Sequence, residues 1–455
     1  MNQFDFSKFS FYTISTLAVL GLPFAFGLYS GYQKTIVFKT VMDLKNAVEK
    51  SLVLVKEESS TLTKTHPSHF LQPAKYKGSG VTVNDVTTDK AEFIFMSGFF
   101  DGGNELRIIR RDGTIVSRWP VIFSEIFPDT SHIHNPPETD WNIDIHGALA
   151  LSDGSVVFNF EYAGLVKLDH LGNIVWKVPR ETHHSVELSE DGGFWVCCRR
   201  FHPEQSDSLF PPFETPFFED TILKVSQDGK ILTEISVPKL FYDNGLESML
   251  TSTGDNITVG THWDKEIVHL NKIEELYSDI AKTFPMFKAN DLALSFRKYN
   301  LIVIMSPETK KIKWWKIGPW VRQHDPEFST NGTIVIFNNN TYRTAFKHPY
   351  YDKSLITIPP VSNIIEYNPN TGTHRVIYGG KANNKMLSVI RGKVELTKNG
   401  GLLITEFEGG RVFEIDDNGR KIWEYINRYD ADEVAEITEA RVYHSSYFSK
   451  TNWEE

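Results

Sequence analysis

The sequence predicts an all-β protein that folds as a six-bladed β-propeller. The first observation is that one β-hairpin pattern returns six times along the chain, and the second is that most copies follow a different hairpin. The recurrent hairpin has an alternating strand, a turn containing Asp or Asn with Gly, and a second alternating strand that often ends on Trp. The third observation is that most of the intervening stretches lack helical periodicity.

The copies of the recurrent hairpin are spread over the whole chain after its first hundred residues. They begin at Leu106, Leu165, Ile222, Ile302, Ile364 and Val412. The second kind of hairpin begins at Leu149, Val186, Glu327 and Val394. Two hairpins supply four strands, and four-stranded units that recur every 40 to 60 residues or so are typical of a propeller rather than of a sandwich.

Two stretches leave the blade count open. Residues 248–261 resemble an inner hairpin that lacks an outer partner, so a seven-bladed propeller is an alternative. Residues 272–288 have the periodicity of a helical insertion.

The N-terminal region is expected to lie outside the propeller. Residues 9–32 carry no charge and are mostly apolar, which is about the length needed to cross a bilayer. We therefore expect residues 1–34 to form a transmembrane anchor of a single-pass membrane protein. A cleaved signal peptide is the alternative, although its apolar region is usually shorter. Lys34, Lys39 and Lys45 outnumber Lys8 across the segment, a count that favours a cytoplasmic C-terminus.

Residues 35–60 are expected to form an amphipathic helix. Apolar residues recur there at three- and four-residue steps from Ile36 to Val55. Such a helix could be a stalk, could mediate a homo-oligomer or a protein complex, or could pack on the globular domain. Residues 61–80 lack periodicity and are expected to be a linker, which leaves residues 81–455 for the propeller.

The composition disfavours nucleic-acid partners and gives no sign of a cofactor. The chain has 48 Lys and Arg against 58 Asp and Glu, a net charge of −10, whereas binding a phosphate backbone requires a basic surface. The only cysteines are the neighbours Cys197 and Cys198, which are too few for a thiolate metal site. We expect neither a metal nor a cofactor.

Three histidines share one phase of the repeat. His146, His184 and His324 each lie seven residues before the Asp or Asn that precedes the glycine of an inner-hairpin turn. Equivalent positions at the start of innermost strands surround the central channel of a propeller, so their rings are expected to meet at one mouth. Converging imidazoles could bind a metal, act as acid, base or nucleophile, or hold an anion.

Short motifs add further residues to this set. They are HLN at 269–271, LSFR at 294–297 and QHDPEFSTNGTIVIFNNN from Gln323 to Asn340. In this order, and with THHSVELSEDG from Thr182, they resemble the arylsulfotransferase family of bacterial six-bladed propellers over about residues 80–447.

The resemblance implies a chemistry for each matching residue. It implies that His324 takes a sulfuryl group from an aryl sulfate and passes it to a phenol, with no nucleotide sulfate donor. It places His269, Arg297 and either His183 or His184 around the transferred group, and the seven-residue phase selects His184. Asn271 is expected to donate a hydrogen bond there or to fix a side chain. His146 and Arg391 are expected to line the channel as further substrate-binding residues.

Two functions follow for testing. The first is a nucleotide-independent sulfotransferase that acts through a sulfohistidine intermediate on small aryl sulfates and phenols, with a propeller that the resemblance places in the periplasm. The alternative is a membrane-anchored, non-catalytic propeller that serves as a binding or scaffold subunit. A metal-dependent hydrolase built on the same histidines is a third and weaker interpretation.

Overall fold

The structure is a computed structural model of the chain. It describes residues 21–33, 35, 37, 38, 40, 41, 44, 45, 66–86, 91–203, 210, 213, 215–250, 267–341, 361–380 and 384–449. The chain divides into two compact units, Met1–Pro67 and Ser68–Glu455.

In the first unit, residues 21–32 are helical, and so are the described positions between 37 and 45. Among the residues that the structure describes, no helix is both long enough and apolar enough to cross a membrane. Residues 1–20 of the expected anchor, most of the expected amphipathic helix and residues 61–65 of the expected linker lie outside the described residues. The rest of the expected linker includes β1 (Leu71–Pro73) and the first residue of β2 (Gly80–Asn84), so it is not free of secondary structure.

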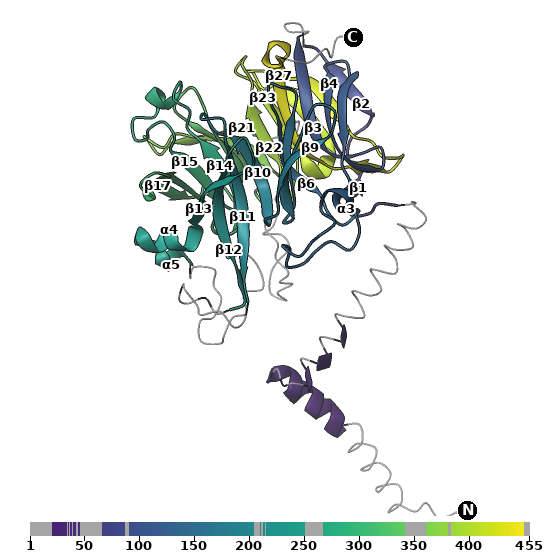
Figure 1. Ribbon diagram of the computed structural model, residues 1–455, viewed down its shortest axis with the longest axis vertical. Helices are drawn as coiled ribbons and strands as arrows, with labels where there is room; N and C mark the ends of the chain where they lie inside the picture. The colour runs from purple at the N-terminus through teal and green to yellow at the C-terminus, as the bar shows by residue number, and fades with distance from the viewer. Residues whose placement is uncertain are drawn as a thin grey trace, which may run out of the picture. The chain divides into compact units, whose positions relative to one another are not determined.

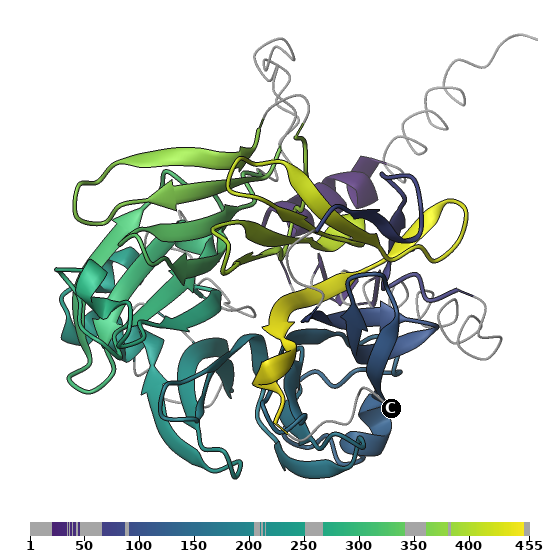
Figure 2. The ribbon, with the colours of Figure 1, turned by 90° about the horizontal axis from the view of Figure 1, so that it is seen from above.

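The second unit is a six-bladed β-propeller, as the sequence predicts (Figures 1 and 2). Its described residues form six antiparallel sheets of at least four strands each. From the centre outward, blade 1 contains β27 (Ile437–His444), β3 (Glu92–Phe100), β4 (Gly103–Arg110) and β5 (Ile115–Pro120). Blade 2 contains β6 (Ile145–Ala150), β7 (Val156–Phe160), β8 (Gly164–Leu168) and β9 (Ile174–Val178). Blade 3 contains β10 (Thr182–Leu188), β11 (Phe194–His202), β12 (Phe217–Val225) and β13 (Ile231–Ser236).

The remaining blades continue around the ring in chain order. Blade 4 contains β14 (Leu270–Glu275), β15 (Leu292–Phe296), β16 (Leu301–Ser306) and β17 (Lys311–Ile317). Blade 5 contains β18 (His324–Phe328), β19 (Ile334–Asn338), β20 (Asn363–Tyr367) and β21 (His374–Gly379). Blade 6 contains β22 (Lys393–Leu396), β23 (Leu402–Glu406), β24 (Arg411–Ile415) and β25 (Lys421–Ile426). Short helices lie between blades, at α3 (Phe123–Ile126), α4 (Val237–Asp243) and α5 (Glu247–Leu250).

The ring closes by pairing the end of the chain with its beginning. The last strand, β27, is the innermost strand of blade 1 and pairs antiparallel with β3, so that Tyr443 faces Phe93. In Figure 2 the yellow β27 lies beside the blue strands of that blade. Two strands add further contacts between the ends of the unit: β2 (Gly80–Asn84) extends blade 6 outside β25, and β1 (Leu71–Pro73) pairs with β26 (Glu433–Ala435). The unit that holds the propeller therefore begins at Ser68, earlier than the expected residue 81.

Tryptophans of the outer strands connect neighbouring blades. Trp119 of blade 1 donates its indole N–H to the carbonyl of Asp169 in blade 2, at 2.9 Å. Trp176 of blade 2 donates to Gln227 O in blade 3, at 2.8 Å. Trp423 of blade 6 donates to Arg111 O in blade 1, also at 2.8 Å. Each acceptor lies in or beside the outer hairpin turn of the following blade, so the repeat of Trp and turn observed in the sequence holds adjacent blades together.

Two expectations about the region near blade 4 need correction. Residues 272–288 do not form a helical insertion, because Leu270–Glu275 is the innermost strand β14 and only Ala281–Thr283 forms a 3-10 turn. The seven-bladed alternative is wrong, because β14 and β15 supply the inner hairpin of blade 4 and the ring closes with six sheets. Residues 251–261 of the expected extra hairpin lie outside the described residues.

One glycine sets the spacing of blades 2 and 3 at the channel. A Cβ atom on Gly147 of β6 would lie 2.1 Å from His184 O and 2.7 Å from Val186 N of β10. Both neighbours are backbone atoms, so a larger residue would force the two innermost strands apart.

We expect Gly147→Ala to lower the free energy of unfolding by about 3 kcal/mol, the upper end of the cost of overpacking a core. The matched control is Gly419→Ala, in an outer turn where the added Cβ meets nothing within 4 Å and φ is +76°. The free energy of unfolding of the control should fall by only about 1 kcal/mol, because alanine is strained at this positive φ. Urea denaturation of both variants measures the difference, and equal losses would contradict the role given to Gly147.

Candidate functional site

A cavity of about 250 Å³ lies where the innermost strands of several blades begin. Its lining includes all but one of the candidate residues from the sequence: His146, His184, His269, Arg297, His324 and Arg391. These side chains come from blades 2 to 6, and the fold brings them together across more than half of the chain.

Irregular backbone at the strand starts places several of these side chains. The β10–β11 ladder shifts register between His183 and Val186, and His184 within that bulge has φ of +51°. His269, just before β14, has φ of +58°, and Arg391, just before β22, has φ of +55°. Left-handed backbone is uncommon for residues other than glycine, and bulges re-aim side chains next to functional sites. The same local distortion therefore recurs in blades 3, 4 and 6.

His184 is the centre of the histidine cluster. Its ring centroid lies 4.1 Å from that of His146, 4.7 Å from that of His269 and 6.3 Å from that of His324. Its Nδ1 also lies 2.7 Å from Nδ1 of His183, so one of these two nitrogens donates a proton to the other. His183 thereby fixes the ring of His184 from behind.

His324 has its ring orientation fixed by Asn339. Nδ1 of His324 lies 2.7 Å from Oδ1 of Asn339, whose amide nitrogen donates to Ser388 O at 2.9 Å and Arg391 O at 2.7 Å. Because the amide nitrogen is committed to two carbonyls, the amide oxygen faces His324 and accepts its Nδ1 proton. A neutral His324 then has its lone pair on Nε2, the nitrogen that a nucleophile would use.

Burial keeps the central imidazoles neutral. Burial, followed by the charge of Arg297, lowers the pKa of His324 well below its usual value. Burial and then the neighbouring His146 lower the pKa of His184, and burial and then Arg391 lower that of His146. These three rings are therefore uncharged near neutral pH, and Arg297 supplies fixed positive charge close to His324.

Carboxylates and Arg391 form another part of the cavity lining, and one of these carboxylates, Glu161, lies 3.6 Å from Nδ1 of His146. Arg391 pairs with Asp144, with Glu161 at 2.9 Å and with Glu436 at 3.6 Å, and its guanidinium lies 4.5 Å over the ring of Phe407. Burial acts to raise the pKa of Asp144, but the charges of Arg391 and His69 hold it at about 2. Arg391 thus reaches the cavity, as expected, but carboxylates surround its guanidinium.

His69 also lines the cavity, although it belongs to none of the motifs and to no phase of the repeat. It lies just before β1, in a stretch expected to be linker, and its Nε2 is 2.5 Å from Oδ1 of Asp144. Its side chain is 39% exposed. Burial acts to lower the pKa of His69, but the hydrogen bond and charge of Asp144 raise it. The pair has the form of a proton-exchanging histidine oriented by a buried carboxylate.

Asn271 is the candidate residue that the cavity does not include. Its amide nitrogen donates to the carbonyl of Gln323 at 2.8 Å, directly before His324. Gln323 is itself buried and donates to Ser295 Oγ and Leu301 O, both at 3.0 Å. Asn271 therefore supports the backbone that carries His324 rather than facing the cavity.

Deeper in the channel lies a separate cluster of buried charges. Lys272 Nζ is 2.7 Å from Glu187, 2.5 Å from Glu327 and 3.0 Å from Asp325. Asp325 also lies 3.2 Å from Lys393 Nζ, so its carboxylate is occupied by lysines rather than by its neighbour His324. Among the residues that the structure describes, no group of three His, Cys, Asp or Glu side chains is placed to hold a metal ion.

Comparison with known families matches residues 147–428, more than half of the chain, to the model described as Arylsulfotransferase (ASST). The match confirms the resemblance found in the sequence. No curated protein matches the chain.

Solved structures give weaker likenesses. A protein of unknown function from Bacteroides caccae shares 14% identity over 74% of this chain and 93% of its own, with a TM-score of 0.44. Virginiamycin B lyase from Staphylococcus aureus shares 12% identity over 79% of this chain and 88% of its own, with a TM-score of 0.39. Hydrazine synthase from Kuenenia stuttgartiensis shares 9% identity over 69% of this chain and 71% of its own, with a TM-score of 0.41. At these scores the likenesses carry no argument about this chain.

The lowered pKa of His146 predicts a pH-dependent effect on stability. Below the usual histidine pKa of 6.5, the unfolded chain binds a proton at this position that the folded chain does not bind, so acidification destabilises the fold. In His146→Gln this contribution is absent. We expect the unfolding free energy of the variant, relative to the parent protein, to rise by up to about 1.4 kcal/mol per pH unit below pH 6.5. Urea denaturation between pH 7.5 and about 5 tests this, and a constant difference would contradict a neutral buried His146.

Proposed function

Because the chain belongs to the arylsulfotransferase family, we propose that the histidine cavity transfers a sulfuryl group from an aryl sulfate to a phenol. The observation that carries the proposal is the state of His324: its Nδ1 proton is committed to Asn339 while burial and Arg297 favour the neutral ring. A buried, neutral and oriented imidazole next to a fixed positive charge has the properties that a nucleophile toward sulfur requires.

In the first half-reaction, Nε2 of His324 attacks the sulfur of the aryl sulfate. The N–S bond forms as the bond between sulfur and the phenolic oxygen breaks, and the phenol leaves. In the second half-reaction, the oxygen of the acceptor phenol attacks the same sulfur and His324 regains its lone pair. The intermediate divides one displacement into two and predicts ping-pong kinetics. The positive charge that forms on the ring is stabilised through the Nδ1 hydrogen bond to Asn339.

The other cavity side chains are suited to hold the sulfuryl oxygens. Sulfuryl transfer resembles phosphoryl transfer, in which positioning and charge stabilisation supply most of the catalysis. Arg297 provides a permanent cation, and His184 and His269, whose ring centroids are 4.7 Å apart, provide imidazole N–H groups in the same cavity. If His183 donates its Nδ1 proton to His184, then Nε2 of His184 is left as a donor toward the oxygens.

His69 is placed to exchange the proton of the phenol. Asp144 occupies its Nε2, which leaves Nδ1 for proton transfer. Burial acts to lower the pKa of His69, but Asp144 raises it, which favours the protonated ring. In the first half-reaction the protonated ring would give its proton to the departing phenolate oxygen. In the second it would take the proton from the acceptor, so that the proton balance of the two steps closes.

The first test is transfer of sulfuryl from 4-nitrophenyl sulfate to a phenol. We expect His324→Ala to lose about 10³-fold or more in kcat/KM, because it removes the atom to which sulfur bonds. His374→Ala, on the exposed outer strand β21, is the matched control and should retain full activity. Retained activity in His324→Ala would remove His324 as nucleophile, and no transfer by the parent protein from any aryl sulfate would favour the scaffold alternative.

The second test asks whether His69 moves the proton. We expect His69→Gln to lower kcat/KM about 10²-fold for a donor with a poor leaving group, such as 4-methylphenyl sulfate, because the departing oxygen needs the proton. With 4-nitrophenol, which departs readily as the anion, the loss should be no more than about threefold. Steady-state kinetics over a series of donors measure this. An equal loss for all donors would show that His69 acts only on the structure of the cavity.

A further inference from the structure

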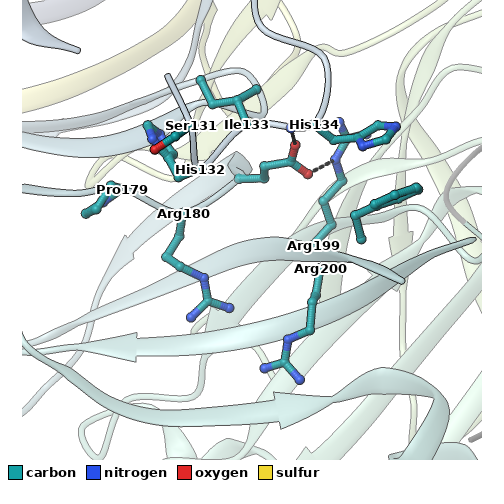
Figure 3. A pocket seen from close by; sticks show the side chains of 10 residues that line it. Ser131, His132, Ile133, His134, Pro179, Arg180, Arg199 and Arg200 are labelled. Carbon is teal, nitrogen blue, oxygen red and sulfur yellow. Dashed lines mark hydrogen bonds and ion pairs between the residues drawn. The ribbon is translucent and has the colours of Figure 1, made fainter. Parts of the chain in front are cut away.

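A second cavity, of about 510 Å³, opens between blades 2 and 3. Its walls are residues 131–134, which precede β6, residues 179–181 between β9 and β10, and residues 199–201 of β11 (Figure 3). Its volume lies within the range of small-molecule sites. The histidine cavity already accounts for the proposed chemistry, so this cavity has no role so far.

The lining of this second cavity is rich in arginine. Arg180 and Arg200 share one carboxylate, Glu234, with N–O distances of 2.5 Å and 2.7 Å. Figure 3 shows these two side chains extending in the same direction, and they are 28% and 49% exposed. The planar guanidinium presents several donors and pairs with carboxylates or sulfates in two-point contacts. Arg200 also lies 3.9 Å from Glu219, a longer contact than the one to Glu234. Because each guanidinium has five N–H donors, both arginines keep donors available to a further anion.

The same cavity has a flat aromatic wall. The rings of His134 and Phe201 are stacked, with centroids 3.6 Å apart. The guanidinium of Arg199 lies between two rings, 3.7 Å from the centroid of Tyr162 and 4.0 Å from that of Phe218, and its Nε donates to Glu181 at 2.9 Å. A planar organic ligand would contact rings on one side and cationic groups on another.

One short loop separates this cavity from the histidine cavity. The β7–β8 loop consists of residues 161–163. Glu161 lines the histidine cavity, and Tyr162 packs between Arg199 and His183, its ring centroid 4.9 Å from that of His183. The carbonyl of Ala163 is bonded to His132 of the second cavity, at 2.8 Å. The two cavities are thus neighbours at the same end of the propeller.

We propose that this arginine pocket, defined by Arg180, Arg199, Arg200, His134 and Phe201, binds the anionic end of an elongated aromatic substrate. The phenolic or sulfated end of that substrate would enter the histidine cavity, past Tyr162. The preferred substrate class is then phenols that carry a carboxylate or a second sulfate on a side chain, rather than simple neutral phenols. This inference rests on the proposed function, because it concerns the substrate of the same reaction.

The experiment uses matched pairs of acceptors with the full-length protein. Each pair is a 4-hydroxyphenyl alkanoic acid and its primary amide, which has nearly the same shape but no charge, in a series of increasing chain length. We expect the parent protein to prefer the acid over the amide by about tenfold or more in kcat/KM at the chain length that spans the two cavities. Arg180→Gln and Arg200→Gln should each remove most of this preference. Their kcat/KM for the amide should stay within about twofold of the value for the parent protein.

Each single variant leaves Glu234 paired with the other arginine, so the fold should persist. Arg375→Gln, an exposed arginine on β21 paired with Glu366, is the matched control and should change neither acceptor. Equal losses for acid and amide, or no preference at any chain length, would overturn the proposal.

A binding measurement separates this inference from the proposed function. Isothermal titration of the 4-hydroxyphenyl alkanoic acids into His324→Ala should detect binding that Arg200→Gln weakens by about tenfold in the same background. Such binding without sulfuryl transfer by the parent protein would contradict the proposed function and support anion binding by the arginine pocket. Transfer to neutral phenols without arginine-dependent binding of the acids would contradict anion binding by the pocket and support the proposed function.

Discussion

The antiparallel pairing of β27 with β3 is the contact on which the geometry of the site depends, because it joins the two ends of the ring. A propeller blade contacts only its neighbours, so the circle must close for the innermost strands to converge. Closure brings residues as distant in sequence as His69 and Glu436 to one cavity of about 250 Å³. β1 and β2 strengthen the joint by pairing with β26 and β25 of the C-terminal part.

The cavity combines buried neutral histidines with a cluster of carboxylates around an arginine, and the two sets meet where Glu161 lies 3.6 Å from Nδ1 of His146. His146, His184 and His324 lie where burial disfavours protonation, whereas Asp144, Glu161 and Glu436 surround Arg391. The charge of Arg297 acts on His324, and the guanidinium of Arg391 is paired with three carboxylates. In the proposed reaction, the positive charge of Arg297 would attract an incoming sulfate group. Asn339 completes the arrangement by choosing the nitrogen of His324 that carries the lone pair.

Much of the fold could be predicted because each repeat is marked by residue types that determine local structure. Turn residues with glycine recur at the hairpin ends, and tryptophans recur on outer strands, where Trp119, Trp176 and Trp423 join neighbouring blades. Strand β14 could not be predicted in the same way. Its Lys272 is buried and paired with Glu187 and Glu327, so the strand lacks the alternation of apolar and polar residues that marks a half-buried strand.

Part of the candidate site could be predicted from the sequence for the same reason. A shared phase placed His146, His184 and His324 at one mouth, and the family motifs added His269 and Arg297. His69 and Asp144 could not be predicted, because they lie outside the family motifs and have no periodic counterpart in other blades. Asn339 lies within the motif that begins at Gln323, but its spacing did not identify it as the partner of His324. Asn271 was assigned to the cavity but supports Gln323 from behind, a distinction that depends on side-chain direction and not on spacing.

In the proposed reaction, His324 carries the sulfuryl group between donor and acceptor. Mass spectrometry can detect this group on the protein after mixing with excess aryl sulfate and no acceptor, an alkaline quench and digestion. We expect a gain of one SO₃ group on the peptide that contains His324, lost on addition of a phenol and absent in His324→Ala. Turnover without any labelled histidine, or a label on His184 or His269 in place of His324, would contradict it.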